Sequence, residues 1–124
     1  MKILIVEDDS GKLRRIQTIL QKYGLEYDVA MTGKDALRLE SEHRYDFAVL
    51  DIEFPWEQDI VGHPGLEIMR VFDKKKSDIK VIVYSNVPVE EIWKKTGEKP
   101  ANCFVIQAVF PFQLENAIKL QLKG

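Results

Sequence analysis

Five short apolar runs recur along the chain, at Ile3–Val6, Tyr27–Ala30, Phe47–Leu50, Val81–Tyr84 and Phe104–Ile106. They are rich in Val, Ile, Phe and Tyr, and most lack the polar alternation of half-exposed strands, which is typical of parallel strands buried on both faces. Stretches with helical spacing separate them, at residues 13–23, 35–42, 66–72, 89–95 and 114–122. Strands alternating with helices predict an α/β fold, a doubly wound parallel sheet with helices on both faces.

Two of the predicted helices carry further detail. Gly24 is placed to end the first one, because glycine readily adopts the left-handed conformation found after a helix end. In the last, a buried stripe is expected at Leu114, Ala117, Ile118 and Leu122.

Length and net charge limit the classes of function that this chain can have. The 124 residues suit a single domain over 1–124, with no room after Leu122 for an output domain. A formal net charge of −2 gives no sign of nucleic-acid binding, and the first apolar run is too short for a membrane span. The single cysteine, Cys103, allows no internal disulfide. We therefore expect a cytoplasmic protein that binds neither nucleic acid nor membrane.

Polar side chains follow the apolar runs. Glu7 and Asp8 come after the first, and Asp51 after the third, with Glu53 two residues on. Ligands of open α/β sheets bind beyond the carboxyl ends of the strands, so we expect Glu7, Asp8 and Asp51 to share one pocket. Clustered carboxylates repel one another unless a cation lies between them, and oxygen ligands of this kind suit Mg²⁺. The alternative is that such acids only cap the following helices or solvate loops.

Such a pocket suits phosphoryl transfer to a carboxylate. The metal and nearby donors would balance the charge on the equatorial oxygens of the phosphoryl group. Ser85, directly after the fourth run, would supply a hydroxyl to one of these oxygens.

At these positions the sequence resembles the receiver domains of response regulators in two-component signalling. The resemblance covers nearly the whole chain and rests on five segments, namely Met1–Asp9, Asp46–Pro55, Gly65–Glu67, Val81–Ser85 and Ala101–Phe104. It implies a flavodoxin-like (βα)5 topology with strand order 2-1-3-4-5. It also implies a signalling module, not an enzyme, that receives its phosphoryl group from a sensor histidine kinase or a histidine phosphotransfer protein and acts through a partner.

The resemblance also assigns roles to residues. Asp51 becomes the phosphoacceptor, and Glu7 and Asp8 become the acid pair. Asp8, Asp51 and the backbone carbonyl of Glu53 become Mg²⁺ ligands. Ser85 and Phe104 become a coupled pair of switch residues.

Two features depart from the family pattern. The family has a lysine at the end of the fifth strand, whereas this chain has none between Cys103 and Asn116. Spacing from Ser85 puts Gln107 at that position. The family's lysine usually precedes a proline, however, and in this chain the residue before Pro111 is Phe110. The second departure is a long segment between Asp51 and Gly65, whose extra residues fall near 56–62.

Three other functions compete with the phosphorylated receiver. The missing lysine favours a pseudo-receiver, an interaction module that keeps the fold and is not switched by phosphate. Asp51 and Glu53 loosely resemble the acids of small aspartyl-phosphate phosphatases, although the chain offers neither a cap nor a loop lysine. A flavin-binding domain would share the architecture, but acids at the strand ends would repel the flavin phosphate.

Overall fold

The structure is a computed structural model that describes residues 1–7, 9–51, 79–84 and 104–123, together with Lys74, Glu90, Trp93 and Lys94. Of Asp51 and residues 104–107 it describes the backbone. The strands are β1 (Lys2–Val6), β2 (Glu26–Ala30), β3 (Phe47–Asp51), β4 (Lys80–Tyr84) and β5 (Phe104–Ala108). The helices are α1 (Ser10–Lys22), α2 (Gly33–Glu42) and α5 (Pro111–Leu122).

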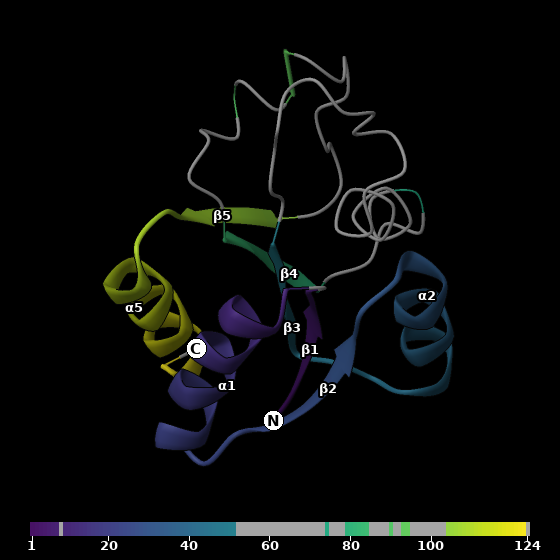
Figure 1. The fold of residues 1–124 in the computed structure, drawn as a ribbon, viewed down its shortest axis with the longest axis horizontal. Coiled ribbons are helices and arrows are strands. Elements are labelled where there is room, and N and C mark those ends of the chain that lie inside the picture. The colour runs from purple at the N-terminus through teal and green to yellow at the C-terminus, as the bar shows by residue number, and fades with distance from the viewer. Residues whose placement is uncertain are drawn as a thin grey trace.

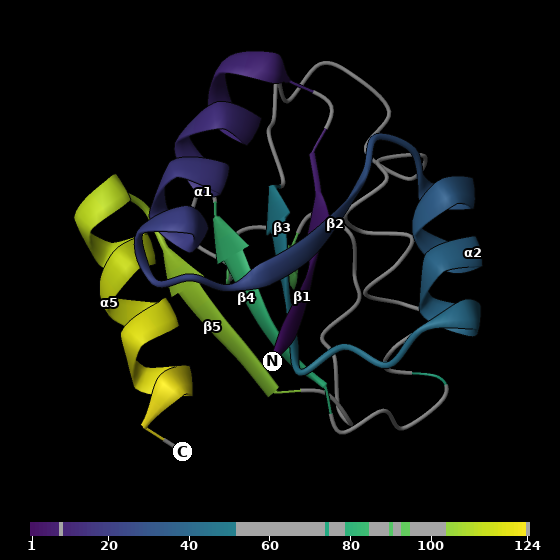
Figure 2. The same ribbon diagram turned by 90° about the horizontal axis from the view of Figure 1, so that it is seen from below.

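All five predicted strands pair in one parallel sheet in the order β2-β1-β3-β4-β5, which confirms the predicted topology. Helices α1 and α5 cover one face of this sheet and α2 covers the other (Figures 1 and 2). The helix predicted at 66–72 lies outside the described residues. Of the one predicted at 89–95, Glu90, Trp93 and Lys94 are described, and all three are helical.

Strands β1, β3 and β4 are buried on both faces, as their sequences predict, whereas in β2 only Ala30 is buried. Alternate residues of β1, β3 and β4 enter two separate cores. The core under α1 and α5 includes Ile3, Ile5, Ile16, Leu20, Phe47, Val49, Ile82, Tyr84, Leu114 and Ile118. The core under α2 includes Leu4, Val6, Ala36, Leu39, Ala48, Leu50, Val81 and Val83. Because strand side chains alternate with a period of two, one continuous apolar run supplies both cores.

Gly24 ends α1 as predicted, with a positive φ of 65°. Its N–H donates to the carbonyl of Gln21 at 3.0 Å, and the N–H of Leu25 donates to that of Leu20 at 3.0 Å. This pair of bonds is the Schellman motif, which satisfies carbonyls that the helix end would leave exposed.

The buried stripe of α5 differs from the prediction at its last member. Leu114, Ala117 and Ile118 are buried, but Leu122 is 37% exposed and Gln121 is buried in its place. Gln121 lies three residues after Ile118 and so continues the same face of the helix. At the final helical residue, apolar character did not decide which side chain packs against the sheet.

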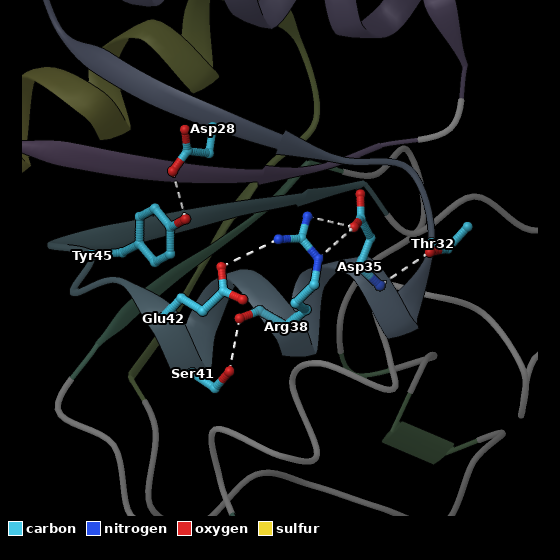
Figure 3. A network of polar contacts seen from close by, with 7 residues as sticks. All are labelled: Asp28, Thr32, Asp35, Arg38, Ser41, Glu42 and Tyr45. Carbon is cyan, nitrogen blue, oxygen red and sulfur yellow. Dashed lines mark hydrogen bonds and ion pairs between the residues drawn. The ribbon is translucent and has the colours of Figure 1, made fainter.

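Local polar contacts cap α2 and run along it, as Figure 3 shows. The Thr32 hydroxyl accepts from the backbone N–H of Asp35 at 3.1 Å and caps the helix. Arg38 pairs with Asp35 at 2.8 Å and with Glu42 at 3.2 Å along one side of the helix. These pairs are solvent-exposed and contribute little to stability.

Candidate functional site

Three strand ends meet at the carboxyl-terminal edge of the sheet, which we call the carboxyl edge. Val6 of β1 pairs with Leu50 of β3. The next residues along these two adjacent strands are Glu7 and Asp51. Asp51 in turn pairs with Tyr84, the last residue of β4. The register therefore places the backbone of Asp51 between the end of β1 and the end of β4.

Glu7 is a buried acid at this edge. Its residue is only 3% exposed, and its Oε1 accepts a hydrogen bond from the backbone N–H of Asp9 at 2.8 Å. Its own N–H donates to the carbonyl of Ala30 at 3.0 Å, which extends the β1–β2 pairing by one step. A carboxylate taken out of water is costly to keep charged unless donors or cations face it. Glu7 thus has the placement expected for a member of an acid pair.

Asp9, the third acid in the run after β1, has a different role. Its carboxylate accepts from the backbone N–H of Lys12 at 2.9 Å, and it is the N-cap of α1. Asp9 therefore has the helix-capping role that the sequence offered as the alternative for acids after the strands. Capping fixes where α1 begins above the sheet.

A contact between α1 and β4 adds two residues that sequence reasoning missed. Nη1 of Arg15 donates to the hydroxyl of Tyr84 at 3.5 Å, across 69 positions of sequence. Tyr84 is 6% exposed and belongs to the core under α1 and α5. The hydrogen bond to Tyr84 raises the pKa of Arg15, and the nearby charge of Asp9 raises it further. No sequence signal marks this pair, because only the sheet register and the packing of α1 bring the two residues together.

The end of β5 bears on the missing lysine. The backbone of Gln107 pairs with Val83, inside the strand. Phe110 follows the strand as the N-cap residue of α5, is 55% exposed, and stacks on Phe112 with ring centroids 5.8 Å apart. Oε1 of Gln113 accepts from the N–H groups of Val109 at 2.8 Å and Phe110 at 3.1 Å, which caps the helix. The two candidate positions for the family's lysine therefore lie inside the strand, at Gln107, and at the start of α5, at Phe110.

A groove of about 470 Å³ runs between α1 and the start of α5. It is lined by Gly11, Arg14, Arg15, Thr18, Ile19, Pro111, Phe112 and Glu115. Arg15 therefore borders both this groove and the end of β4. Arg14 and Arg15 line the groove from α1, and Glu115, which pairs with Lys22 at 2.9 Å, lines it from α5.

Several predicted site residues lie outside the described residues, namely Asp8, Glu53, Ser85 and the loop at 56–62. The side chains of Asp51, Phe104 and Gln107 are not described either. Among the side chains that are described, no group of three or more His, Cys, Asp and Glu could hold a metal ion. Since Asp8 and the Asp51 carboxylate fall outside that search, the predicted Mg²⁺ ligands stay a prediction.

The sequence matches the response regulator receiver domain family over residues 3–119. The chain belongs to this family. It is 29% identical over 127 residues to the aerobic respiration control sensor protein ArcB of Escherichia coli K12, covering 91% of this chain and 16% of ArcB. It is 30% identical over 123 residues to the probable transcriptional regulator ycf27 of Cyanidium caldarium, covering 98% of this chain and 46% of that protein. The receiver domain thus spans less than half the length of these two relatives.

The fold agrees with solved receiver structures. The response regulator protein TrrA of Thermotoga maritima, in complex with Mg²⁺ and BeF, matches with a TM-score of 0.69 and 28% identity, covering 97% of both chains. The predicted family and fold are therefore confirmed. Among the described parts of the receiver domain, no helix is long and apolar enough to cross a membrane.

Proposed function

We propose that this receiver domain accepts a phosphoryl group on Asp51 and signals through a partner protein. The observation that carries the proposal is the register at the carboxyl edge. Asp51 ends β3 beside the buried acid Glu7 on one side and Tyr84 on the other. An acid at the end of a buried central strand is held in place by the sheet, as a nucleophile needs to be.

The proposed reaction is attack on a phosphohistidine. An oxygen of the Asp51 carboxylate forms a bond to phosphorus as the P–N bond breaks, and the imidazole nitrogen leaves with the electron pair. A sensor histidine kinase or a histidine phosphotransfer protein would carry that donor. Two relatives are by name a sensor protein and a probable histidine kinase of rice, and the latter is 39% identical over 77 residues.

The residues at this edge fit a hard divalent cation such as Mg²⁺. Glu7 is buried and acidic, and Asp51 follows on the adjacent strand, so a cation here would offset their mutual repulsion. Asp8, Asp51 and the carbonyl of Glu53 would be the direct ligands. When bound, Mg²⁺ would neutralise charge on the phosphoryl oxygens. That TrrA, a similar protein, was solved with Mg²⁺ and BeF supports this choice of metal.

Intact mass measurement tests the proposal. The protein is incubated with phosphoramidate and Mg²⁺, with Asp51→Asn as the matched variant. We expect a gain of one phosphoryl group in the wild type, dependent on Mg²⁺, and none in Asp51→Asn. A gain that persists in Asp51→Asn would show that another residue is the acceptor.

The second candidate is a pseudo-receiver, favoured by the absence of lysine between Cys103 and Asn116. Such a module would bind its partner equally well with and without phosphate. If neither phosphoramidate nor a histidine kinase modifies the wild type, this candidate replaces the first.

A further inference from the structure

Phosphorylation poses a charge problem at the carboxyl edge. Glu7, Asp9 and Asp51 already lie there, and turning the Asp51 carboxylate into an acyl phosphate takes the charge of this side chain from about −1 to about −2. One Mg²⁺ offsets the two charges of the phosphoryl group and leaves those of Glu7 and Asp9. The stretch from Phe104 to Glu115, which forms β5 and the start of α5, contains neither lysine nor arginine. A protein cation at this site would have to come from another element.

Arg15 is a cation that the fold brings to this edge. It lies in the second turn of α1, whose first residues stand over the carboxyl ends of the strands (Figure 2). Its guanidinium contacts the Tyr84 hydroxyl, and Tyr84 is the register partner of Asp51. Neighbouring strands lie about 4.8 Å apart, so the backbone that carries Asp51 is one strand away from the backbone that carries Tyr84.

Resting on the proposed function, we propose that Arg15 supplies the protein cation that stabilises the phosphoryl group on Asp51. In the unphosphorylated domain the guanidinium lies against the Tyr84 hydroxyl. In the phosphorylated domain it turns to the phosphoryl oxygens, which accept charge-assisted hydrogen bonds from its planar N–H groups.

The resting contact allows this movement. A donor–acceptor distance of 3.5 Å is at the long limit for a hydrogen bond, so little is lost when it breaks. Arg15 is exposed and borders the groove between α1 and α5, which leaves its side chain room to rotate. A neutral hydroxyl is also a weaker acceptor than a phosphoryl oxygen, so the charged acceptor wins when it is present.

Binding of Mg²⁺ alone and of Mg²⁺ with beryllofluoride, followed by calorimetry, tests the role of Arg15. Arg15→Gln removes the charge, and Arg15→Lys keeps it. Arg14→Gln is the matched control, since Arg14 is the neighbouring cation and lines the same groove. Tyr84→Phe removes the resting contact but keeps the buried ring.

We expect Arg15→Gln to weaken beryllofluoride binding about tenfold, the loss typical of one charge-assisted hydrogen bond. Mg²⁺ binding alone should stay the same or become tighter, because a repelling cation has been removed. Arg15→Lys should restore most of the affinity, while Arg14→Gln and Tyr84→Phe should bind as the wild type does. The salt dependence of beryllofluoride binding should also become shallower in Arg15→Gln.

Two results would overturn the proposed role of Arg15 and leave the proposed function intact. One is wild-type beryllofluoride affinity in Arg15→Gln. The other is equal weakening in Arg15→Gln and Tyr84→Phe with a lower unfolding temperature in both, which would mean that the contact only holds α1 to the sheet. Failure of the wild type to bind beryllofluoride or to accept phosphate would instead remove the proposed function, and the role of Arg15 with it.

Discussion

The acids toward the two ends of the sheet differ in the groups that they contact. Towards the amino-terminal end, Asp28 in the middle of β2 accepts from the Tyr45 hydroxyl at 2.6 Å and pairs with Lys2 at 3.1 Å (Figure 3 shows the Tyr45 contact). Asp46 accepts from the backbone N–H of Lys2 at 2.8 Å. We call these four residues the amino-edge network. At the carboxyl edge, the carboxylates of Glu7 and Asp9 accept backbone N–H groups, as that of Asp46 does.

The difference separates stability from function. In the amino-edge network a cation and a hydroxyl from the fold itself balance the Asp28 carboxylate, so its charge serves the folded state. At the carboxyl edge, the proposed function would have a bound cation balance the charge of Glu7 and Asp51. We expect mutations in the amino-edge network to change stability and mutations of Glu7 and Asp51 to change binding. Asp9 lies at the carboxyl edge but caps α1, so its mutation should change stability.

The sharpest way to break this comparison is to neutralise one acid at each end. Asp51→Asn should abolish phosphorylation and, without Mg²⁺, raise stability by on the order of 1 kcal/mol because one repelling charge is gone. Asp28→Asn should leave phosphorylation intact and cost about 1–2 kcal/mol, because its charge-assisted contacts become weaker. Mass spectrometry and urea unfolding measure the two effects. A loss of stability in Asp51→Asn would contradict the division.

Restoring a lysine at the carboxyl edge should give the next largest effect. Gln107→Lys should tighten beryllofluoride binding about fivefold, since a charged donor contributes roughly 1 kcal/mol more than a neutral amide. Phe110→Lys tests the other alignment at the same edge, and titration with beryllofluoride in Mg²⁺ measures both. Tighter binding in Phe110→Lys alone would place the family's lysine position at residue 110.

The dependence of stability on pH in the acidic range tests how much Asp28 contributes to the amino-edge network. The hydrogen bond from Tyr45, helped by Lys2, lowers the pKa of Asp28 below its ordinary value. This stabilisation is therefore full above the ordinary aspartate pKa and is lost as the pH falls through the lower pKa of the folded state. Asp28→Asn and Tyr45→Phe should both flatten the unfolding curve in this acidic window, as followed by circular dichroism. An unchanged curve in both variants would mean that Asp28 does not contribute.

The smallest effect is expected at the N-cap of α1. Asp9→Ala should destabilise the domain by about 1 kcal/mol because the N–H of Lys12 loses its acceptor. Asp9→Ser keeps an acceptor and serves as the control. Thermal unfolding measures both, and Mg²⁺ affinity should change little. A large loss of Mg²⁺ affinity in both variants would make Asp9 part of the metal site after all.

The sequence by itself determined the five strands, the described helices and the edge of the sheet at which Glu7 and Asp51 lie. Apolar runs such as Phe47–Leu50 encode strands buried on both faces, and the residue after each run must emerge at a strand end, so Glu7 and Asp51 could be placed from the pattern alone. Backbone periodicity is local, which is why sequence reasoning reaches this far.

Only the tertiary structure decided which side chains meet. Asp9 caps a helix while Glu7 is buried two residues before it, and both read simply as acids in the sequence. Arg15 and Tyr84 are 69 residues apart, and their contact depends on the strand register and on how α1 packs over the sheet. Such contacts are set by the packing of distant elements, and no local pattern in the chain encodes that packing.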